Sequence, residues 1–358
     1  MSNIRELFED LEDPRASNVT HRLGDLMIIM IAACLCGQYT ATDMALFAQL
    51  RKDVLNRIIP YDTAPSHDTF SRILRLIDRE QFASLFERFA SGFAKAVDAQ
   101  GGADVVAIDG KALRRAYEKG LSYQPHMVVS AFASASGLCL GAVCPSEGKG
   151  EIDGALKVVE LLDLTGRIVT ADALHCTHEM TELLHGKKAD FVLGLKKNRY
   201  HWYKQVEALF ETCNPDCITT VEHNHGRHEV RSASVIEVTQ PQTHGHSAYG
   251  RIVSTRNAGK PLTRYFLLSK PMHPEELLEC TRAHWHIENK LHWILDVVMD
   301  EDQARTRKDH APTNLALIKR IARNILQLVD NPKVPISHRI RKCTFDEQCL
   351  INAIAHMR

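Results

Sequence analysis

Two aspartates in this sequence each follow a short apolar run of the kind that forms a buried strand. Asp109 comes after Val105–Ile108, and Asp172 comes after a run that includes Val169. A single aspartate in such a place is typical of a turn or a helix cap. Ligands of open α/β sheets, however, bind at the carboxyl ends of the strands, and a buried carboxylate needs a cation or hydrogen bonds to compensate its desolvation. We therefore expect the two carboxylates to lie side by side at one ligand site.

A third carboxylate comes from the segment Arg282–Asp302, whose apolar residues recur at helical spacing. Glu288, His292 and Asp296 follow one another at intervals of four residues, which places them on one stripe of that helix. If the helix packs on the sheet with Glu288 facing the strand ends, three carboxylates come together; the alternative is a solvated polar stripe. Because adjacent carboxylates repel one another, a shared divalent cation is the simplest way to hold them close.

The elements that must position these residues fall into a helical part and a mixed part. Residues 1–95 carry apolar residues at helical spacing, and Pro65–Asp78 has the start signals and arginines of a helix that reads DNA or simply belongs to a bundle. The glycines at 101–102 are a candidate linker. After them the pattern predicts three strands, a helix, a strand, a helix and a strand, with a hairpin at the turn 136–137. This order describes a mixed α/β sheet.

Composition excludes several classes of protein. Of the 358 residues, 44% are hydrophobic and 25% charged, as in globular proteins and unlike disordered or collagen-like chains. The 44 basic and 44 acidic residues cancel, so any attraction for nucleic acid must come from local segregation of charge. The longest apolar run, Leu26–Cys36, is too short for a transmembrane helix and does not open the chain, so we expect a buried helix. Ten cysteines without a secretory signal indicate reduced thiols in a cytoplasm.

Several motifs resemble those of one family. The stretches AIDGKALR, IVTADALHC, FVLGLKKN, HGRHEVR and HWHIENKLHWILDVVMDEDQARTR are similar to those of the DDE transposases of bacterial insertion sequences, specifically the H-repeat-associated group. PSHDTFSRIL is similar to the N-terminal associated region of that group. The resemblance runs from near residue 5 to about residue 330, and its last motif is highly specific.

The resemblance implies an α/β fold with a ribonuclease-H-like catalytic core, whose acidic triad is Asp109, Asp172 and Glu288. In such a site two Mg²⁺ ions about 3.5–4 Å apart activate a water or a 3′-hydroxyl and stabilise the leaving oxygen of a phosphodiester. Mg²⁺, for which Mn²⁺ can substitute, prefers oxygen ligands. Asp109 would bridge both ions, while Asp172 and Glu288 would hold one each.

The resemblance also implies three regions. Residues 1–98 would form a helical transposase-associated domain that could bind DNA. Residues 103–330 would form the DDE catalytic domain, with a β-rich insertion at about 215–270, where short alternating runs predict strands. Residues 331–358 would be a C-terminal tail.

Basic residues gather beside the predicted acidic site. Gln303–Lys342 carries ten Lys and Arg against two Asp, whereas the preceding His286–Asp302 has five carboxylates opposed only by Lys290. An acidic metal site next to a basic track is typical of phosphodiester chemistry on DNA, although either run alone could be a solvated face. A second cluster, Lys196–Lys204, interleaves cations with aromatic residues, as segments that hold phosphates and stack bases do. The residues we expect to bind DNA are Lys196, Lys197, Asn198, Arg227, Lys290, Arg305, Arg307 and Lys308, and the track is expected to extend to Lys319, Arg320 and Arg323.

Histidine and cysteine residues offer a different chemistry. Cys213, Cys217, His223 and His225 could close a structural zinc site, although their spacing fits no common zinc finger. His225 and its neighbours are more readily explained as part of an insertion that approaches DNA.

Two other functions remain open. The segment Gly148–Asp153 departs from the Lys-Ser-Asn-Glu-Ile that is usual in the H-repeat-associated group and keeps only Glu151 and Ile152. This favours a catalytically inactive, DNA-binding descendant of a transposase, whereas the three retained carboxylates favour the enzyme. A plain metal-dependent nuclease is the third possibility. Trp285 and Trp293 could stack a flipped base, but core packing is their expected role.

The sequence therefore predicts the DNA transposase of an insertion sequence, which binds the ends of its element and catalyses metal-dependent strand cleavage and strand transfer. Its expected partners are double-stranded DNA, as terminal inverted repeats and as target, and a second copy of the chain in a homodimer on DNA. No membrane is involved in this prediction, and the expected location is the bacterial cytoplasm, in association with the nucleoid.

Overall fold

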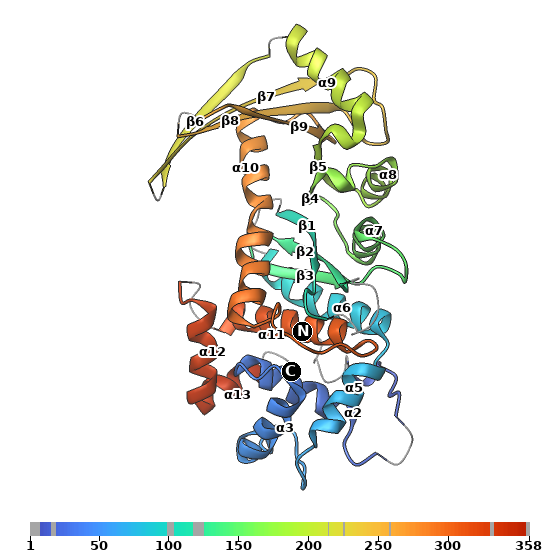
Figure 1. Cartoon of the computed structure of the whole chain (residues 1–358), viewed down its shortest axis with the longest axis vertical. Coiled ribbons are helices and arrows are strands. Elements are labelled where there is room, and N and C mark those ends of the chain that lie inside the picture. The colour runs from blue at the N-terminus through green and yellow to red at the C-terminus, as the bar shows by residue number, and fades with distance from the viewer. Residues whose placement is uncertain are drawn as a thin grey trace.

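A nine-stranded sheet runs through the molecule, and a layer of helices from both ends of the chain lies against one end of it (Figure 1). The structure is a computed structural model that describes residues 8–15, 19–98, 104–116, 125–213, 215–224, 226–257, 259–329 and 333–355. The strand order is β3-β2-β1-β4-β5-β9-β8-β7-β6.

The N-terminal part is helical, as predicted. Its helices are α2 (Leu23–Leu35), α3 (Ala41–Leu50), α4 (Lys52–Leu55), α5 (His67–Leu76) and α6 (Arg79–Asp98). Helix α2 contains most of the long apolar run and is buried almost throughout, because the other helices surround it on its sides. In the part of the chain that the structure describes, no helix is both long and apolar enough to cross a membrane.

The central part is the predicted mixed α/β sheet. Its elements are β1 (Val105–Ala112), β2 (Met127–Ala133), β3 (Leu138–Val143), α7 (Glu151–Leu161), β4 (Ile168–Ala171), α8 (His178–Gly186) and β5 (Asp190–Leu195). Strands β1–β3 form an antiparallel meander, while β1, β4 and β5 run parallel. The predicted hairpin turn is present, and Gly137 adopts the positive φ of 68° that closes it.

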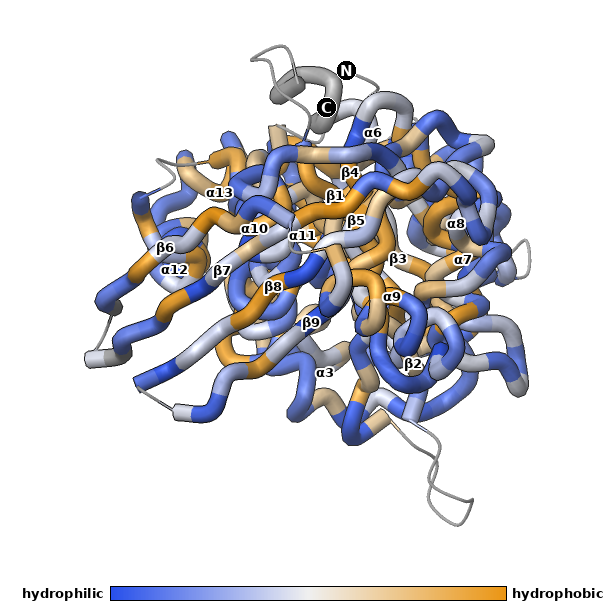
Figure 2. The backbone as a smooth tube through the Cα atoms, turned by 90° about the horizontal axis from the view of Figure 1, so that it is seen from above, coloured by the Kyte–Doolittle hydropathy of each residue, from blue (hydrophilic) through white to orange (hydrophobic). Residues whose placement is uncertain are grey.

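The β-rich segment continues the same sheet. Helix α9 (Tyr200–Thr212) leads to β6 (Cys217–Asn224), β7 (Arg227–Glu237), β8 (Ala248–Arg256) and β9 (Leu262–Leu268). Strand β9 pairs antiparallel with β5, so the insertion extends the central sheet without a break. Figure 2 shows hydrophobic residues gathered around β1, β3, β4 and β5, whereas β6–β9 mix hydrophobic and hydrophilic residues.

The last part of the chain ties the sheet to the N-terminal helices. Helix α10 (Pro274–His284) crosses the sheet on the side opposite α7 and α8 (Figure 1), and α11 (Ala311–Val329) packs between β3 and the helices α2, α5 and α6. The segment expected as a C-terminal tail forms two helices, α12 (Ile336–Phe345) and α13 (Glu347–Ala355). They pack on α2 and α11 because they carry buried apolar residues, among them Cys343, Leu350 and Ala353.

A side chain of α11 satisfies the backbone at the edge strand β3. The amide of Asn324 accepts the Cys139 N–H at 2.9 Å and donates to the Cys139 carbonyl at 2.7 Å, as another strand would. We expect Asn324→Leu to lower the free energy of unfolding by about 2–4 kcal/mol, because both buried backbone groups lose their partners. Urea unfolding measures this, with the exposed Asn352→Leu as the control. A loss no larger than that of the control would contradict this role of Asn324.

Candidate active site

Asp109 lies on β1 where the parallel pairing with β4 ends. The last pair between these strands is Ile108 with Ala171, whereas Asp109 pairs only with Ser130 of β2. Strand β1 does not end at Asp109, because β2 continues to pair with it over the three residues Gly110, Lys111 and Ala112. Asp109 is therefore held by regular strand geometry and not by a loop.

Asp172 follows the last residue of β4 and begins a short 3₁₀ turn, Ala173–His175. Its carboxylate is 61% exposed, and Lys196 Nζ lies 3.3 Å from its Oδ2. Lys196 itself follows the last residue of β5. The carboxyl ends of two neighbouring parallel strands, β4 and β5, therefore place a carboxylate and an ammonium group at the same edge of the sheet.

Glu288 comes from a widened helical segment that continues α10. Residues Ile287–His292 and Ile294–Val298 are π-helical, with an i→i+5 hydrogen bond from Met299 N–H to the Ile294 carbonyl. Such widened turns are rare and often occur at functional sites. The segment is fixed to the sheet by its buried residues Ile287 and Leu291, which leaves Glu288 exposed.

Two hydrogen bonds fix the end of α10 that leads into this segment. His284 Nδ1 lies 3.0 Å from Thr170 Oγ1 on β4, and Ser134 Oγ donates to the Ala283 carbonyl at 2.8 Å. Because Thr170 is two residues before Asp172, the bond from His284 sets the position of Glu288 relative to the end of β4.

The structure brings the three predicted carboxylates into one electrostatic neighbourhood. Burial raises the pKa of Asp109 to about 7, together with the charges of Glu151, Glu288 and Asp172. Burial, followed by the charge of Asp172, also raises the pKa of Glu288. The site therefore carries more negative charge than its surroundings neutralise.

These residues suit a divalent cation by their chemistry. All the donors are carboxylate oxygens, the ligands that Mg²⁺ prefers, and a cation would relieve the repulsion among them. Within the described ranges, no group of three or more His, Cys, Asp or Glu side chains is arranged so that it could hold a metal ion as it stands. The arrangement is thus an open acidic site at a sheet edge and not a closed structural metal centre.

A cavity of about 490 Å³ opens beside the acidic site. Asp172 and Glu288 line it together with Lys196, Lys197 and Trp285. The expectation that the tryptophans pack in the core is wrong: Trp285 is 43% and Trp293 is 54% exposed. The apolar positions of this helical segment are already filled by Ile, Leu and Met, and the tryptophans fall on its other faces.

The predicted DNA-binding residues fall into two groups. Lys196, Lys197 and Asn198 follow β5 at the cavity, and Asn198 Nδ2 donates to the Ala173 carbonyl at 2.8 Å. Lys290 is exposed on the same helical segment as Glu288. Lys196 and Lys197 are therefore close to the carboxylates, whereas Lys290, two positions after Glu288, lies on a different face of the helical segment.

The other candidates lie further away. Arg305 and Lys308 are in the loop before α11, and Arg307 Nε donates to the Arg115 carbonyl at 3.1 Å, beyond the end of β1. Arg227 is the first residue of β7, and its side chain lies outside the described part of the structure. The sheet places β7 three strands from β5.

The expected extension of the basic track along α11 is wrong. Lys319, Arg320 and Arg323 are each 1% exposed or less, so they cannot contact DNA. Arg323 Nη2 donates to the Lys290 carbonyl at 3.0 Å, and Lys319 Nζ lies 4.8 Å from the centre of the Tyr39 ring. These cations belong to the interior between the sheet and the N-terminal helices.

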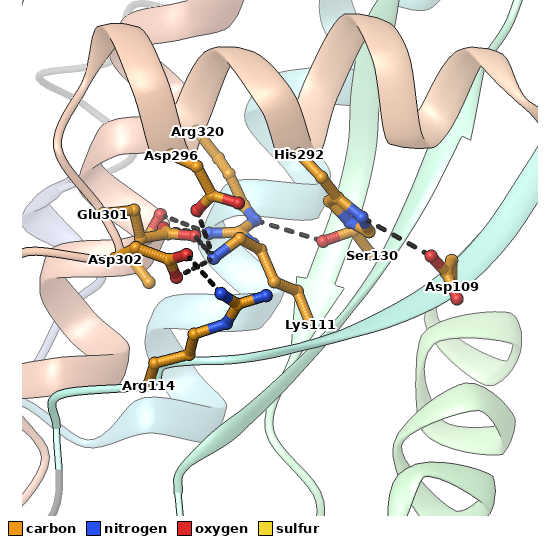
Figure 3. Close-up of polar contacts among 10 residues, drawn as sticks. Asp109, Lys111, Arg114, Ser130, His292, Asp296, Glu301, Asp302 and Arg320 are labelled. Atoms are coloured by element: carbon orange, nitrogen blue, oxygen red, sulfur yellow. Dashed lines mark hydrogen bonds and ion pairs between the residues drawn. The ribbon is translucent and has the colours of Figure 1, made fainter.

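His292 and Asp296, which share the predicted stripe with Glu288, face β1 (Figure 3). His292 Nδ1 lies 3.4 Å from Asp109 Oδ2, and Asp296 Oδ1 lies 2.5 Å from Lys111 Nζ. A solvated stripe is thus excluded for these two side chains. Asp109 and Lys111 are two residues apart on one strand and so share a face. His292 and Asp296 are likewise four residues apart on one helix face. These two spacings together are the sequence signal from which the pairs Asp109–His292 and Lys111–Asp296 could have been predicted.

A buried ionic network continues from this stripe (Figure 3). Lys111 Nζ also lies 3.2 Å from both Glu301 and Asp302, and Arg320 Nη1 lies 2.9 Å from Glu301 Oε1. Burial alone would raise the pKa of Glu301, but the charges of Arg320 and Lys111 outweigh it and hold that pKa below its ordinary value. This network was not predicted from the sequence.

The residues considered for zinc do not assemble in the described structure. Cys213 and Cys217 are exposed, and the ring of His223 packs 4.6 Å from that of His228. His225 lies outside the described residues.

Comparisons with known proteins bear on this arrangement. Residues 100–325 match the family model described as the transposase DDE domain, and residues 5–90 match the model described as DDE_Tnp_1-associated.

The chain is 29% identical over 356 residues to the "H repeat-associated putative transposase YhhI" of Escherichia coli K12, covering 94% of this chain and 93% of that protein. It is 28% identical over 354 residues to the "Putative transposase YncI" of Escherichia coli O157:H7, covering 94% and 90%. A solved piggyBac transposase synaptic complex with hairpin DNA matches with a TM-score of 0.44 and 12% identity, covering 99% of this chain and 77% of that chain.

Proposed function

Because the chain belongs to the family of the transposase DDE domain, we propose that it is the DNA transposase of an insertion sequence. It binds the ends of its element and catalyses metal-dependent strand cleavage and strand transfer. The observation that carries this proposal is the convergence of Asp109, Asp172 and Glu288 from β1, the end of β4 and the segment after α10.

The three carboxylates are the ligands of Mg²⁺ in this proposal, with Mn²⁺ as a substitute. Asp109, Asp172 and Glu288 would hold these ions through their carboxylate oxygens. Bound divalent ions supply charge stabilisation to the attacking and leaving oxygens of the phosphodiester. The protein contributes rigid placement: Asp109 is fixed by strand pairing and Glu288 by a helix bonded to β4.

The core in this proposal is ribonuclease-H-like. The order β3-β2-β1-β4-β5, with an antiparallel meander followed by parallel strands, supports it. We further propose that residues 1–98 form a helical domain that helps to grip DNA and that residues 103–330 form the catalytic domain.

The cavity beside the triad is the proposed path of the DNA backbone. Lys196 is 65% exposed, and among the described residues its ion-pair partner is the exposed Asp172, so it can exchange this partner for a phosphate once a cation occupies the site. Lys197 lines the same cavity, and Lys290 lies on the same helical segment as Glu288. Arg227, Arg305, Arg307 and Lys308 serve more distant phosphates. We propose a homodimer on DNA in the bacterial cytoplasm, at the nucleoid.

A cleavage assay tests the proposed function. The substrate is a labelled duplex that carries the DNA flanking the coding region, and the buffer contains Mg²⁺. We expect the wild-type chain to cut at a fixed position at the element's end, and Asp172→Asn to reduce the rate by roughly 10²-fold or more, because one carboxylate ligand is lost. The exposed Asp216→Asn serves as the control and should cut at the wild-type rate.

Two outcomes would contradict the proposal. Binding of this DNA without cutting in Mg²⁺ or Mn²⁺ would identify an inactive DNA-binding descendant, the function that the altered segment Gly148–Asp153 favours. Cutting at the same rate in duplexes with and without the element's ends would identify a plain nuclease.

A further inference from the structure

Glu151, the first residue of α7, lies against β1 beside Asp109. A Cβ atom at Gly110 would come within 2.5 Å of Glu151 Cδ and Cγ and within 2.8 Å of its Oε1. Gly110 does not have a positive φ among the described glycines, so its backbone does not require glycine. The reason for glycine at this position is therefore space, and the space is occupied by the carboxylate of Glu151.

A fully buried histidine holds this carboxylate. His175 is 0% exposed, and its Nε2 lies 3.1 Å from Glu151 Oε1. His175 ends the short turn that begins at Asp172, so one turn supplies a triad residue and the partner of Glu151. Within the described ranges Oε2 of Glu151 has no hydrogen-bond partner, and the side chain remains 22% exposed, so that oxygen is free to bind a ligand.

A helix-capping role does not account for this arrangement. Asp153, two residues later, already bonds the backbone before α7, because its Oδ2 accepts the Ser146 N–H at 2.7 Å. Glu151 makes no such bond to the start of α7. Its carboxylate turns away from solvent toward β1, where Asp109 already stands, and two carboxylates at close range repel one another unless a cation or a proton neutralises one of them.

We propose that Glu151 is a fourth carboxylate of the metal-binding site, positioned by His175, and that it shares a divalent cation with Asp109. The inference rests on the proposed function, because it adds a ligand to the same site. It also gives a role to the acidic residue that the segment Gly148–Asp153 retains.

Mn²⁺ binding to the full-length chain tests this without DNA cleavage. Free Mn²⁺ is followed by electron paramagnetic resonance for the wild-type chain, Glu151→Gln, Asp109→Asn and Glu160→Gln. Glu160 is exposed near the other end of α7, so its variant removes the same charge from the same helix. We expect Glu151→Gln to weaken Mn²⁺ binding by about 10-fold or more and Glu160→Gln to leave it unchanged. His175→Gln should weaken binding by a smaller factor, because the carboxylate remains but is no longer held.

Iron-dependent cleavage of the backbone gives a second readout. Fe²⁺ with ascorbate and peroxide cuts a protein chain beside the bound ion, and we expect wild-type cuts near both residue 110 and residue 151. The cut near residue 151 should vanish in Glu151→Gln. Gly110→Ala keeps the carboxylate but forces the Glu151 side chain to shift away from β1, so this variant should also weaken Mn²⁺ binding. Circular dichroism and thermal melting identify any variant that fails to fold.

The outcomes separate this inference from the proposed function. Wild-type Mn²⁺ affinity in Glu151→Gln, with affinity lost in Asp109→Asn, would overturn the fourth ligand and leave the triad standing. No Mn²⁺ binding by the wild-type chain and no cleavage of end DNA would overturn both. Equal losses in Glu151→Gln and Glu160→Gln would assign the effect to the charge of α7 and would also overturn the inference.

Discussion

Asp109→Asn is expected to lower the rate of strand cleavage by roughly 10³-fold or more, because a residue at the centre of a catalytic unit is lost. The same substitution should make the metal-free protein more stable. Burial and three neighbouring carboxylates raise the pKa of Asp109 from 3.8 to about 7, so its ionised form is disfavoured in the folded protein. Asparagine has a similar shape and no charge.

The pH dependence follows from the sign of this shift. Between 3.8 and about 7 the folded protein holds a proton on Asp109 that the unfolded chain releases. The stability that this proton confers is complete below 3.8 and is lost as the pH rises to about 7. At pH values above this range, Asp109→Asn should exceed the wild type by about 1–3 kcal/mol in free energy of unfolding, because it cannot ionise.

Urea unfolding over a range of pH, without divalent ions, measures this difference. The gap between variant and wild type should widen with rising pH and close again when Mg²⁺ is added to the wild type, because a cation neutralises the carboxylates. Asp216→Asn, outside the acidic site, should show no such trend. A variant that is less stable than the wild type at every pH would contradict the raised pKa of Asp109.

Arg320→Met is expected to destabilise the protein by about 3–5 kcal/mol, because it leaves a buried carboxylate without its main partner. Arg320 is 0% exposed and lies 2.9 Å from Glu301 Oε1, and its Nε donates to Ser130 Oγ at 3.1 Å. Ser130 is the β2 residue paired with Asp109, so the substitution should also disturb the strand that carries the triad.

A double variant separates the charge from the packing. Arg320→Met with Glu301→Leu removes both partners and should recover part of the loss, since an apolar pair can replace a buried ion pair at little cost. Arg305→Met, in the loop before α11, is the control for removing an arginine. Unfolding in urea gives the four free energies of this cycle, which are those of the wild type, Arg320→Met, Glu301→Leu and the double variant. A double variant that is no more stable than Arg320→Met would indicate that the arginine acts through packing alone.

The candidate site was predictable as far as it follows from local patterns. Asp109 and Asp172 were found because an acidic residue after an apolar run marks the edge of a buried sheet. Helical spacing placed Glu288 on one stripe with His292 and Asp296, and the resemblance to DDE transposases then assigned it as the third carboxylate. The buried apolar helix α2 and the hairpin at Gly137 were found from the same kinds of signal.

The rest depends on contacts between distant parts of the chain. Arg320 and Arg323 belong to a stretch with an excess of positive charge, which suggested a DNA-binding face. They are buried because α11 lies between the sheet and the N-terminal helices, and because Glu301 neutralises Arg320. Counting the charges within one stretch of sequence identifies neither the place of α11 nor this partner. Glu151 likewise joins the site only because β3 leads back across the sheet, so that α7 begins beside β1.

The meeting of the two ends of the chain has a consequence for its synthesis. Thr344 of α12 donates to the carbonyl of Cys36, at the end of α2, across 308 residues of sequence. At a ribosomal rate of about 5–20 residues per second, α2 emerges roughly 15–60 s before this partner exists. During that time an almost wholly apolar helix has no complete cover, so it needs chaperones or transient contacts. We expect a chain that ends early to leave part of this helix uncovered and to be degraded faster than the finished protein.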